Sequence, residues 1–294
     1  LAPPKPEAGR TAGDYGPTAH GFDSTVDSPP GTRGHSLPAG FPRTGGGKGG
    51  YLADHLTDEA LAAIERHRAG PFFLYLAHHV PHTPIEGKPE LVAHYGKKLA
   101  ARPDIRIRNA AYAAMIHSLD ESVGRVVGKI DELGLRGRTL ILFLSDNGGL
   151  TQRYGEIDNI ADNSPLRRGK GSAYEGGVRV PFLVRWPGVV PAGRTCATPV
   201  MTIDILPTVL AAAGVAPNTK PGADADGVSL LGLLEDPAAA LKRDALFWHY
   251  PHYHAGGDAP YSAIRQGSWR LIDFHDDTPR SEERRVGKEC RSRW

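Results

Sequence analysis

Three short, continuous apolar runs constrain the fold of this chain more than any other feature. They occupy residues 72–77, 139–144 and 180–184. A strand buried on both faces has this pattern, whereas a strand with one solvated face alternates apolar and polar residues. Helical patterns separate the runs, and strands that alternate with helices form parallel β-α-β units. The sequence therefore predicts an α/β fold with a mostly parallel sheet sandwiched by helices.

The helical patterns have recognisable ends. Thr57 is a candidate N-cap followed by two acidic residues, which predicts a helix over residues 57–69. Apolar residues three or four apart predict a second helix over residues 107–133, with Gly134 as its C-cap. A third helix is expected over residues 203–213.

Changes in local composition along the chain predict four parts. Residues 1–50 are rich in Gly and Pro and are expected to form a loop-rich connecting segment of the main domain, whose α/β body covers residues 51–236. Short alternating runs predict the start of a small antiparallel C-terminal subdomain over residues 237–279. Residues 280–294 lack an apolar period and resemble translated vector sequence at the end of a truncated gene prediction. A genuine basic tail is the alternative.

Charge and composition exclude several classes of function. The net charge is +2, but residues 280–294 hold six Lys or Arg and three Asp or Glu, so the rest of the chain carries −1. No nucleic-acid partner is therefore expected. No run of 18 apolar residues exists, so we expect no membrane span. Two cysteines are too few for a disulfide framework or a thiolate zinc site. The sequence does not indicate the oligomeric state.

Polar clusters accompany the apolar runs, and ligands gather at the ends of strands in open parallel sheets. Asp146 and Asn147 offer hard oxygen ligands for Ca²⁺ or Mg²⁺, although an isolated Asp-Asn-Gly is more often an Asx turn. Lys170 stands between glycines and suits an anionic group, although a solvated loop lysine is commoner. His82 lies on a Pro-flanked segment that suits a general acid, although a loop histidine is more often structural or exposed. The preceding His78 and His79 are expected to be structural.

These clusters, in this order, resemble the motifs of the formylglycine-dependent sulfatases of the alkaline-phosphatase-like superfamily. The segments are Phe-Phe-Leu-Tyr-Leu-Ala-His-His-Val-Pro-His-Thr-Pro (72–84), Leu-Ser-Asp-Asn-Gly-Gly (144–149) and Gly-Lys-Gly-Ser-Ala-Tyr-Glu-Gly-Gly-Val-Arg-Val-Pro (169–181). Trp-Pro-Gly (186–188) and Asp-Ile-Leu-Pro-Thr (204–208) also look like that family. The resemblance runs from about residue 15 to residue 273. It implies an alkaline-phosphatase-like fold and hydrolysis of a sulfuric ester.

The resemblance gives each candidate a role. His82 matches the family histidine that contacts the sulfate and assists departure of the alcohol, and Lys170 matches the lysine that neutralises the sulfate ester. Asp146 and Asn147 match two ligands of the divalent cation, usually Ca²⁺, with Mg²⁺ as the alternative. Sulfuryl transfer moves negative charge onto the leaving oxygen, which a cation, a lysine and a donor histidine all address. The family also implies a periplasmic or secreted location.

The chain departs from the family pattern at its front. The family's nucleophile is a formylglycine made from the cysteine of Cys-x-Pro-x-Arg, and neither Cys196 nor Cys290 stands in such a motif. The leading Asp-Asp pair, which supplies further metal ligands, is also missing. We therefore expect the formylglycine in a missing N-terminal segment. The chain as written, which has no signal peptide, is expected to be an inactive fragment.

The sequence gives weaker evidence for the substrate than for the reaction. Residues 247–254 cluster aromatic rings and imidazoles, and His252 and His254 are the candidate substrate-binding residues. Such rings suit a sugar and its hydroxyls, with a packed edge of a small sheet as the alternative. The expected substrate is a sulfated carbohydrate or an aryl sulfate. Two other functions stay open: a phosphate or phosphonate ester hydrolase of the same superfamily, and a non-catalytic remnant that binds sulfated glycans.

Overall fold

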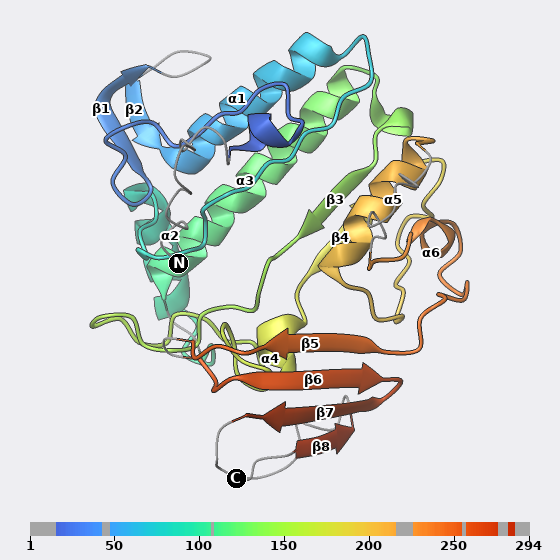
Figure 1. Ribbon diagram of the computed structural model, residues 1–294. Helices are drawn as coiled ribbons and strands as arrows, with labels where there is room; N and C mark the ends of the chain where they lie inside the picture. Colours follow the sequence, from blue (N-terminus) through green and yellow to red (C-terminus); the bar gives the residue numbers. More distant parts are fainter. Residues whose placement is uncertain are drawn as a thin grey trace, which may run out of the picture. The chain divides into compact units, whose positions relative to one another are not determined.

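The computed structural model describes residues 16–42, 48–106, 109–215, 226–254, 257–275 and 282–285. The chain forms two compact units (Figure 1). Unit 1 comprises Leu1–Lys98 and Ala110–Leu133, and unit 2 comprises Leu99–Asn109 and Gly134–Trp294. Both contain helices and strands, as expected for a mixed fold. Within the described residues, no helix is long and apolar enough to cross a membrane.

Two long helices that lie side by side form the body of unit 1 (Figure 1). They are α1 (Leu52–His67) and α3 (Ala110–Glu132). Their side-chain contacts join later residues of one to later residues of the other, Thr57 to Ser122 and then Asp58 to Arg125, so the helices run parallel. Both helices were predicted from their apolar period. Gly134 follows α3 with a φ of +69°, the left-handed conformation expected of a C-cap glycine.

The predicted start of α1 at Thr57 is wrong. The helix begins at Leu52, and its first N–H donates to the carbonyl of His35 over 2.8 Å. Leu52 and Leu56 are buried against Leu37, so the apolar face that must be covered extends one turn further forward than the N-cap signal suggested. Thr57 is fully buried, and its hydroxyl bonds within the helix pair.

The front of unit 1 holds a hairpin that the Gly- and Pro-rich composition did not predict. β1 (Ser36–Pro42) pairs antiparallel with β2 (Lys48–Tyr51), and Leu37 faces the helix α1. The run of glycines at residues 45–47 lies outside the described residues. The other described elements of this part are η2 (Pro17–His20) and α2 (Pro89–Ala100), of which α2 was also not predicted.

The predicted strand at residues 72–77 does not form. Phe73 and Tyr75 are 61% and 72% exposed, and Leu76 packs against the buried cluster of Leu37, Leu52 and Leu56. A strand exists only where a neighbouring backbone accepts and donates its hydrogen bonds, and no described segment does so here. The apolar run is therefore extended chain rather than a sheet strand.

The two other predicted strands form in unit 2 but pair in the opposite sense. β3 (Ile141–Leu144) and β4 (Phe182–Arg185) are antiparallel, from Ile141 opposite Arg185 to Leu144 opposite Phe182. The predicted parallel sheet is thus wrong for the described residues, in which every strand pair is antiparallel. A parallel pair needs a long crossover, usually a helix, whereas the only helix between β3 and β4 is the single turn α4 (Glu175–Val178).

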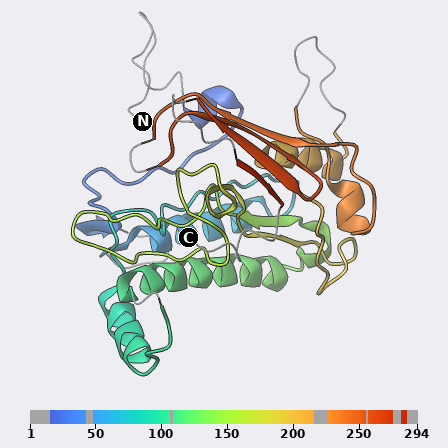
Figure 2. The ribbon, with the colours of Figure 1, turned by 90° about the horizontal axis from the view of Figure 1, so that it is seen from below.

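The small antiparallel sheet near the C-terminus forms as predicted. Its strands follow one another in the order β5 (Leu246–Tyr250), β6 (Tyr261–Gln266), β7 (Trp269–Phe274) and β8 (Glu282–Arg285), and Figure 2 shows their common twist. One face packs on residues that flank α4, and its buried members are Ala173, Tyr174, Tyr261, Ala263 and Ile272. β8 lies in the stretch predicted as a non-native tail, of which residues 280–281 and 286–294 are outside the described part. Unit 2 also contains η3 (Arg136–Arg138), η4 (Thr202–Asp204), α5 (Ile205–Ala212) and α6 (Leu231–Glu235).

Candidate functional site

His82, the candidate general acid, is an exposed residue of unit 1 on the segment between α1 and α2. Its Nδ1 lies 3.0 Å from the carbonyl and 3.3 Å from the hydroxyl of Thr83. The carbonyl can only accept, so the shorter contact favours the tautomer with the proton on Nδ1. Nε2 has no hydrogen bond or ion pair with any described residue. The imidazole therefore has its proton-exchanging nitrogen open to a ligand.

The backbone around His82 is fixed by three hydrogen bonds from unit 1. The carbonyl of His82 accepts from Nε2 of the buried His35 over 2.8 Å. The carbonyl of Glu86 accepts from the Tyr51 hydroxyl over 2.8 Å, and the N–H of His82 donates to His79 over 2.8 Å. An exposed ring on a fixed backbone is what proton transfer in constant geometry requires.

His78 is structural, as expected. Its Nε2 lies 2.8 Å from Ser122 Oγ, which lies 2.6 Å from Thr57 Oγ1, which lies 2.6 Å from the Ala53 carbonyl. The carbonyl can only accept, so the protons run in one direction, from His78 Nε2–H through the two hydroxyls to Ala53. Burial lowers the pKa of His78 to about 4, with a further contribution from the charge of His79. His78 is therefore neutral at neutral pH and ties its segment to both helices.

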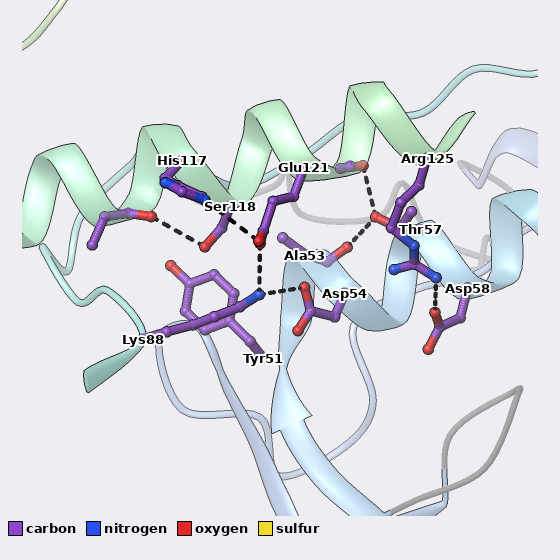
Figure 3. A network of polar contacts seen from close by, with 12 residues as sticks. Tyr51, Ala53, Asp54, Thr57, Asp58, Lys88, His117, Ser118, Glu121 and Arg125 are labelled. Atoms are coloured by element: carbon purple, nitrogen blue, oxygen red, sulfur yellow. Dashed lines mark hydrogen bonds and ion pairs between the residues drawn. The ribbon is translucent and has the colours of Figure 1, made fainter. Parts of the chain in front are cut away.

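Lys88 holds the other end of the same segment (Figure 3). Its Nζ lies 2.8 Å from Asp54 of α1 and 3.2 Å from Glu121 of α3. Burial alone would lower the pKa of Lys88, but the hydrogen bonds and charges of the two carboxylates outweigh it and raise that pKa. The lysine stays charged and joins the two helices to the segment that carries His82.

The candidate metal ligands lie in unit 2 at the end of β3. Asp146 is exposed, and its Oδ1 accepts the N–H of the next residue, Asn147, over 2.9 Å. Ser145 Oγ donates to the Asn147 carbonyl over 2.9 Å. The second carboxylate oxygen of Asp146 has no partner among the described residues. The turn thus closes the strand and still leaves oxygen atoms available to a cation.

The donor set in the described residues is incomplete for a cation of the expected kind. Ca²⁺ takes six to eight oxygens, and the side chains of Asp146 and Asn147 supply at most three. Within the described residues no group of three His, Cys, Asp or Glu side chains could hold a metal ion. These residues therefore fit part of a calcium site and not a whole one.

Glycines bring the Asp146–Asn147 turn into backbone contact with the loop that carries Lys170. The N–H of Gly148 donates to the Gly177 carbonyl over 2.9 Å, and the N–H of Lys170 donates to the Gly149 carbonyl over 3.1 Å. A Cβ on Gly148 would lie 1.7 Å from the Gly176 carbonyl oxygen, and a Cβ on Gly169 would lie 2.4 Å from that of Gly149. The Gly-Gly and Gly-Lys-Gly motifs are therefore needed for this close approach.

We predict that Gly148→Ala destabilises unit 2 by roughly 1–3 kcal/mol or more, because the atoms in the way are backbone and cannot rotate aside. Urea unfolding measures the loss. Gly232→Ala in α6 is the matched control, since nothing lies within 4 Å of its added Cβ and a helical Gly→Ala change stabilises by up to about 1 kcal/mol. Equal midpoints for the two variants would contradict the close approach.

Lys170 has a fixed backbone and an open ammonium group. Besides the bond from its N–H, its carbonyl accepts from Gln152 Nε2 over 2.7 Å. The side chain is half-buried, and its Nζ forms no ion pair or hydrogen bond with any described residue. A lysine held in this way can neutralise an anion as a point charge.

The two candidate substrate-binding histidines have different surroundings. His254 is half-buried, and its ring fills the space that a side chain on Gly171 would need, with Nδ1 at 2.6 Å from such a Cβ. His252 is exposed and packs edge-on against Tyr250, with 5.7 Å between ring centroids. The structure brings His254 to the Lys170 loop and leaves His252 at the edge of the small sheet.

Two residues that the sequence did not single out hold this loop cluster together. Asn163 binds the backbone of Gly149 with both amide atoms, at 3.1 Å and 3.0 Å, and also reaches the Arg168 carbonyl at 3.1 Å. Asp258 accepts hydrogen bonds from Ser172 and Ala173. Asp258 acts on partners 85 and 86 residues away and Asn163 on Gly149, 14 residues away, and no local pattern marks either residue.

The comparisons with known proteins agree with one another. A sulfatase family model matches residues 8–215, and a model of the C-terminal part of N-sulphoglucosamine sulphohydrolase matches residues 169–283. A sulfatase of Formosa agariphila is 35% identical over 226 residues, which are 73% of this chain and 39% of that protein. Steryl-sulfatase of Mus musculus is 38% identical over 204 residues, which are 68% of this chain and 30% of that protein.

A solved structure gives the same result. The crystal structure titled Ps i-CgsB has a TM-score of 0.66 and 32% identity and covers 80% of this chain and 48% of its own. This likeness confirms the alkaline-phosphatase-like fold class, and both family models favour a sulfatase over the phosphate or phosphonate alternative. The chain spans well under half the length of the curated relatives named above. With a family model over most of its length and relatives at this identity, the chain belongs to the sulfatase family.

Proposed function

We propose that this chain is part of a sulfuric ester hydrolase and contributes the loops that receive the sulfate group. One observation carries the proposal: the Asp146–Asn147 turn and the Lys170 loop are joined backbone to backbone by glycines, while the ammonium group of Lys170 has no described partner. Oxygen ligands for a cation and an open positive charge therefore belong to one loop cluster. That combination suits an oxyanion with an ester bond to be broken.

Lys170 is proposed to neutralise the sulfate. A sulfate monoester carries one negative charge, and charge grows on the bridging oxygen as the S–O bond breaks. A cation held in place before the reaction stabilises that charge without reorganising. The two backbone hydrogen bonds of Lys170 supply this preorganisation.

His82 is proposed to protonate the leaving alcohol oxygen. In its charged form the ring keeps the Nδ1 proton on the Thr83 carbonyl and gives the Nε2 proton to the oxygen from which sulfur departs. The ring then remains as the neutral Nδ1–H tautomer, which the same hydrogen bond favours.

Two further components of the proposal come from the family resemblance. Asp146 and Asn147 are proposed as ligands of Ca²⁺, which would offset the negative charge of the sulfate oxygens when bound. The nucleophile is proposed to be a formylglycine encoded outside residues 1–294, since neither cysteine of this chain stands in the required motif. A periplasmic or secreted location is proposed with them.

A sulfated carbohydrate is the proposed substrate. A structure of Ps i-CgsB in complex with k-i-k-neocarrahexaose is 33% identical to this chain, with a TM-score of 0.62, and covers 76% of the chain. The half-buried imidazole of His254 beside the Lys170 loop, with Tyr250 6.4 Å away between ring centroids, suits a sugar ring next to its sulfate.

The test compares an aryl sulfate and an aryl phosphate as substrates of the gene product expressed with its upstream reading frame and a formylglycine-generating enzyme. We expect hydrolysis of the sulfate to exceed that of the phosphate, and removal of Ca²⁺ by a chelator to lower it. A preference for phosphate would overturn the sulfatase proposal. Binding of sulfated oligosaccharides with no turnover of either ester would favour the non-catalytic remnant.

A further inference from the structure

The turn that follows β5 is tied to the Lys170 loop by one carboxylate. Asp258 Oδ2 accepts the hydroxyl of Ser172 over 2.7 Å and the N–H of Ala173 over 2.9 Å. The N–H of Asp258 in turn donates to the Gly171 carbonyl over 3.0 Å. We propose that Asp258 is a positioning residue that sets the conformation of the Lys170 loop, and through it the place of the ammonium group. This inference rests on the proposed role of Lys170.

The groups that Asp258 satisfies are buried, so they depend on it. Ser172 is 4% exposed and Ala173 is fully buried. Without the carboxylate, the Ala173 N–H loses its acceptor in a place that water does not reach. A buried unsatisfied donor is costly, so the loop would shift to find another partner.

Packing around the two segments gives a second reason for the coupling. Gly171 has a φ of +80°, and a side chain there would meet the ring of His254. A Cβ on Gly257 would lie 2.4 Å from the Gly171 carbonyl oxygen. Each segment thus has a glycine, Gly171 or Gly257, where the two backbones meet. The hydrogen bonds of Asp258 fix which residues of one segment lie opposite which residues of the other.

Both hydrogen bonds to the Asp258 side chain end on the same oxygen, Oδ2. A variant that keeps this acceptor but removes the charge can therefore show whether Asp258 acts through its hydrogen bonds or through its charge. An asparagine can place its amide oxygen at that position and accept both bonds. Asp258→Asn should therefore keep the loop in place, whereas Asp258→Ala should release it. If Asp258 acted through its charge, the two variants would be equally impaired.

Hydrogen exchange on the chain tests the positioning directly, without any need for catalysis. In Asp258→Ala the amides of residues 169–173 should exchange at least about tenfold faster, while those of α3 stay unchanged. Asp258→Asn and the exposed-residue control Asp273→Ala should match the wild type within about threefold. No acceleration in a folded Asp258→Ala protein would overturn the inference. If that variant does not fold, Ser172→Ala removes one of the two bonds and should show the same local acceleration to a smaller extent.

Kinetics of the active enzyme then link the loop to Lys170. Asp258→Ala should lower kcat/KM for the aryl sulfate and raise the inhibition constant of inorganic sulfate by about tenfold each, because the lysine meets the anion before and during the reaction. Asp258→Asn should restore both constants. A lowered kcat/KM with an unchanged inhibition constant for inorganic sulfate would contradict the route through Lys170. Accelerated exchange in a protein that hydrolyses no sulfate ester would instead contradict the proposed function and leave the positioning intact.

Discussion

Replacing Lys170 with Ala should lower kcat/KM for a sulfate ester by about 100-fold or more in the active enzyme. The lysine backbone is held from both sides, by the bond of its N–H to Gly149 and the bond of its carbonyl from Gln152. Its ammonium group has no described partner that would hold it away from a ligand. Removal of the side chain leaves the loop unchanged and the charge of the sulfate uncompensated, so the loss is chemical rather than structural.

Two companion variants make this expectation specific. Lys242 is an exposed lysine of the same unit, and Lys242→Ala should keep kcat/KM within about twofold, because exposed charges away from the site matter little at physiological salt. Lys170→Arg keeps the charge but replaces a point charge with a wider planar group, so it should recover only part of the activity. Activity of Lys170→Ala within about threefold of the wild type, with an unchanged melting temperature, would remove Lys170 from the site.

The loop motifs of unit 2 show what can be predicted from sequence and why. Asp-Asn-Gly-Gly and Gly-Lys-Gly were singled out for their residue types, and the structure joins these two motifs. These motifs could be picked out from the sequence because a backbone approach this close requires glycine. The roles of Asn163 and Asp258 could not be predicted in this way. A polar side chain that forms hydrogen bonds with a distant backbone segment looks, in the sequence, like any other polar residue of a loop.

The formation and pairing of several strands could not be predicted from the sequence. The apolar run at residues 72–77 has the composition of a buried strand, yet Phe73 and Tyr75 are exposed and no described segment pairs with it. The composition of a segment indicates whether it can be buried. A strand also needs a neighbouring strand to pair with, and the residues of the apolar run do not indicate whether one is present. The direction of pairing between β3 and β4 depends in the same way on the connection between them. The strands β5, β6 and β7 were predicted correctly because their connections, residues 251–260 and 267–268, are shorter than the crossover that parallel pairing needs.

Replacing Asp204 with Asn should destabilise unit 2 by about 3–5 kcal/mol at neutral pH. The carboxylate is fully buried, and both its oxygens are used: Arg243 Nη1 lies 2.7 Å from Oδ1 and Arg243 Nη2 lies 2.9 Å from Oδ2. The N–H groups of Met201 and Val228 also donate to it, over 2.8 Å and 3.0 Å. One carboxylate thus holds three segments of the chain, and an amide leaves the mostly buried guanidinium without its counter-charge.

The destabilisation should depend on pH in a defined direction. Burial alone would raise the pKa of Asp204, but the hydrogen bonds from Arg243 and from the two N–H groups, with the charge of Arg243, lower it below its ordinary value. The folded state therefore binds fewer protons than the unfolded state, and stability rises with pH. The contribution is fully present above the unfolded pKa of about 3.9 and is lost as the pH falls through the folded pKa. The difference in unfolding free energy between wild type and Asp204→Asn should accordingly shrink as the pH is lowered below about 4.

Urea unfolding of both proteins at neutral pH and near pH 3 measures this difference, with Asp244→Ala as control. Asp244 is the exposed carboxylate next to Arg243 in sequence, so its removal should change the unfolding free energy by less than about 0.5 kcal/mol. A loss for Asp204→Asn that is equally large at both pH values would mean that packing, and not the charged pair, carries the effect. The distinction matters for the site, because Asp204, like Lys170, belongs to a segment that resembles the family. The oxygens of Asp204 are all used inside the fold, which makes it structural, whereas Lys170 keeps its charged group open to a ligand.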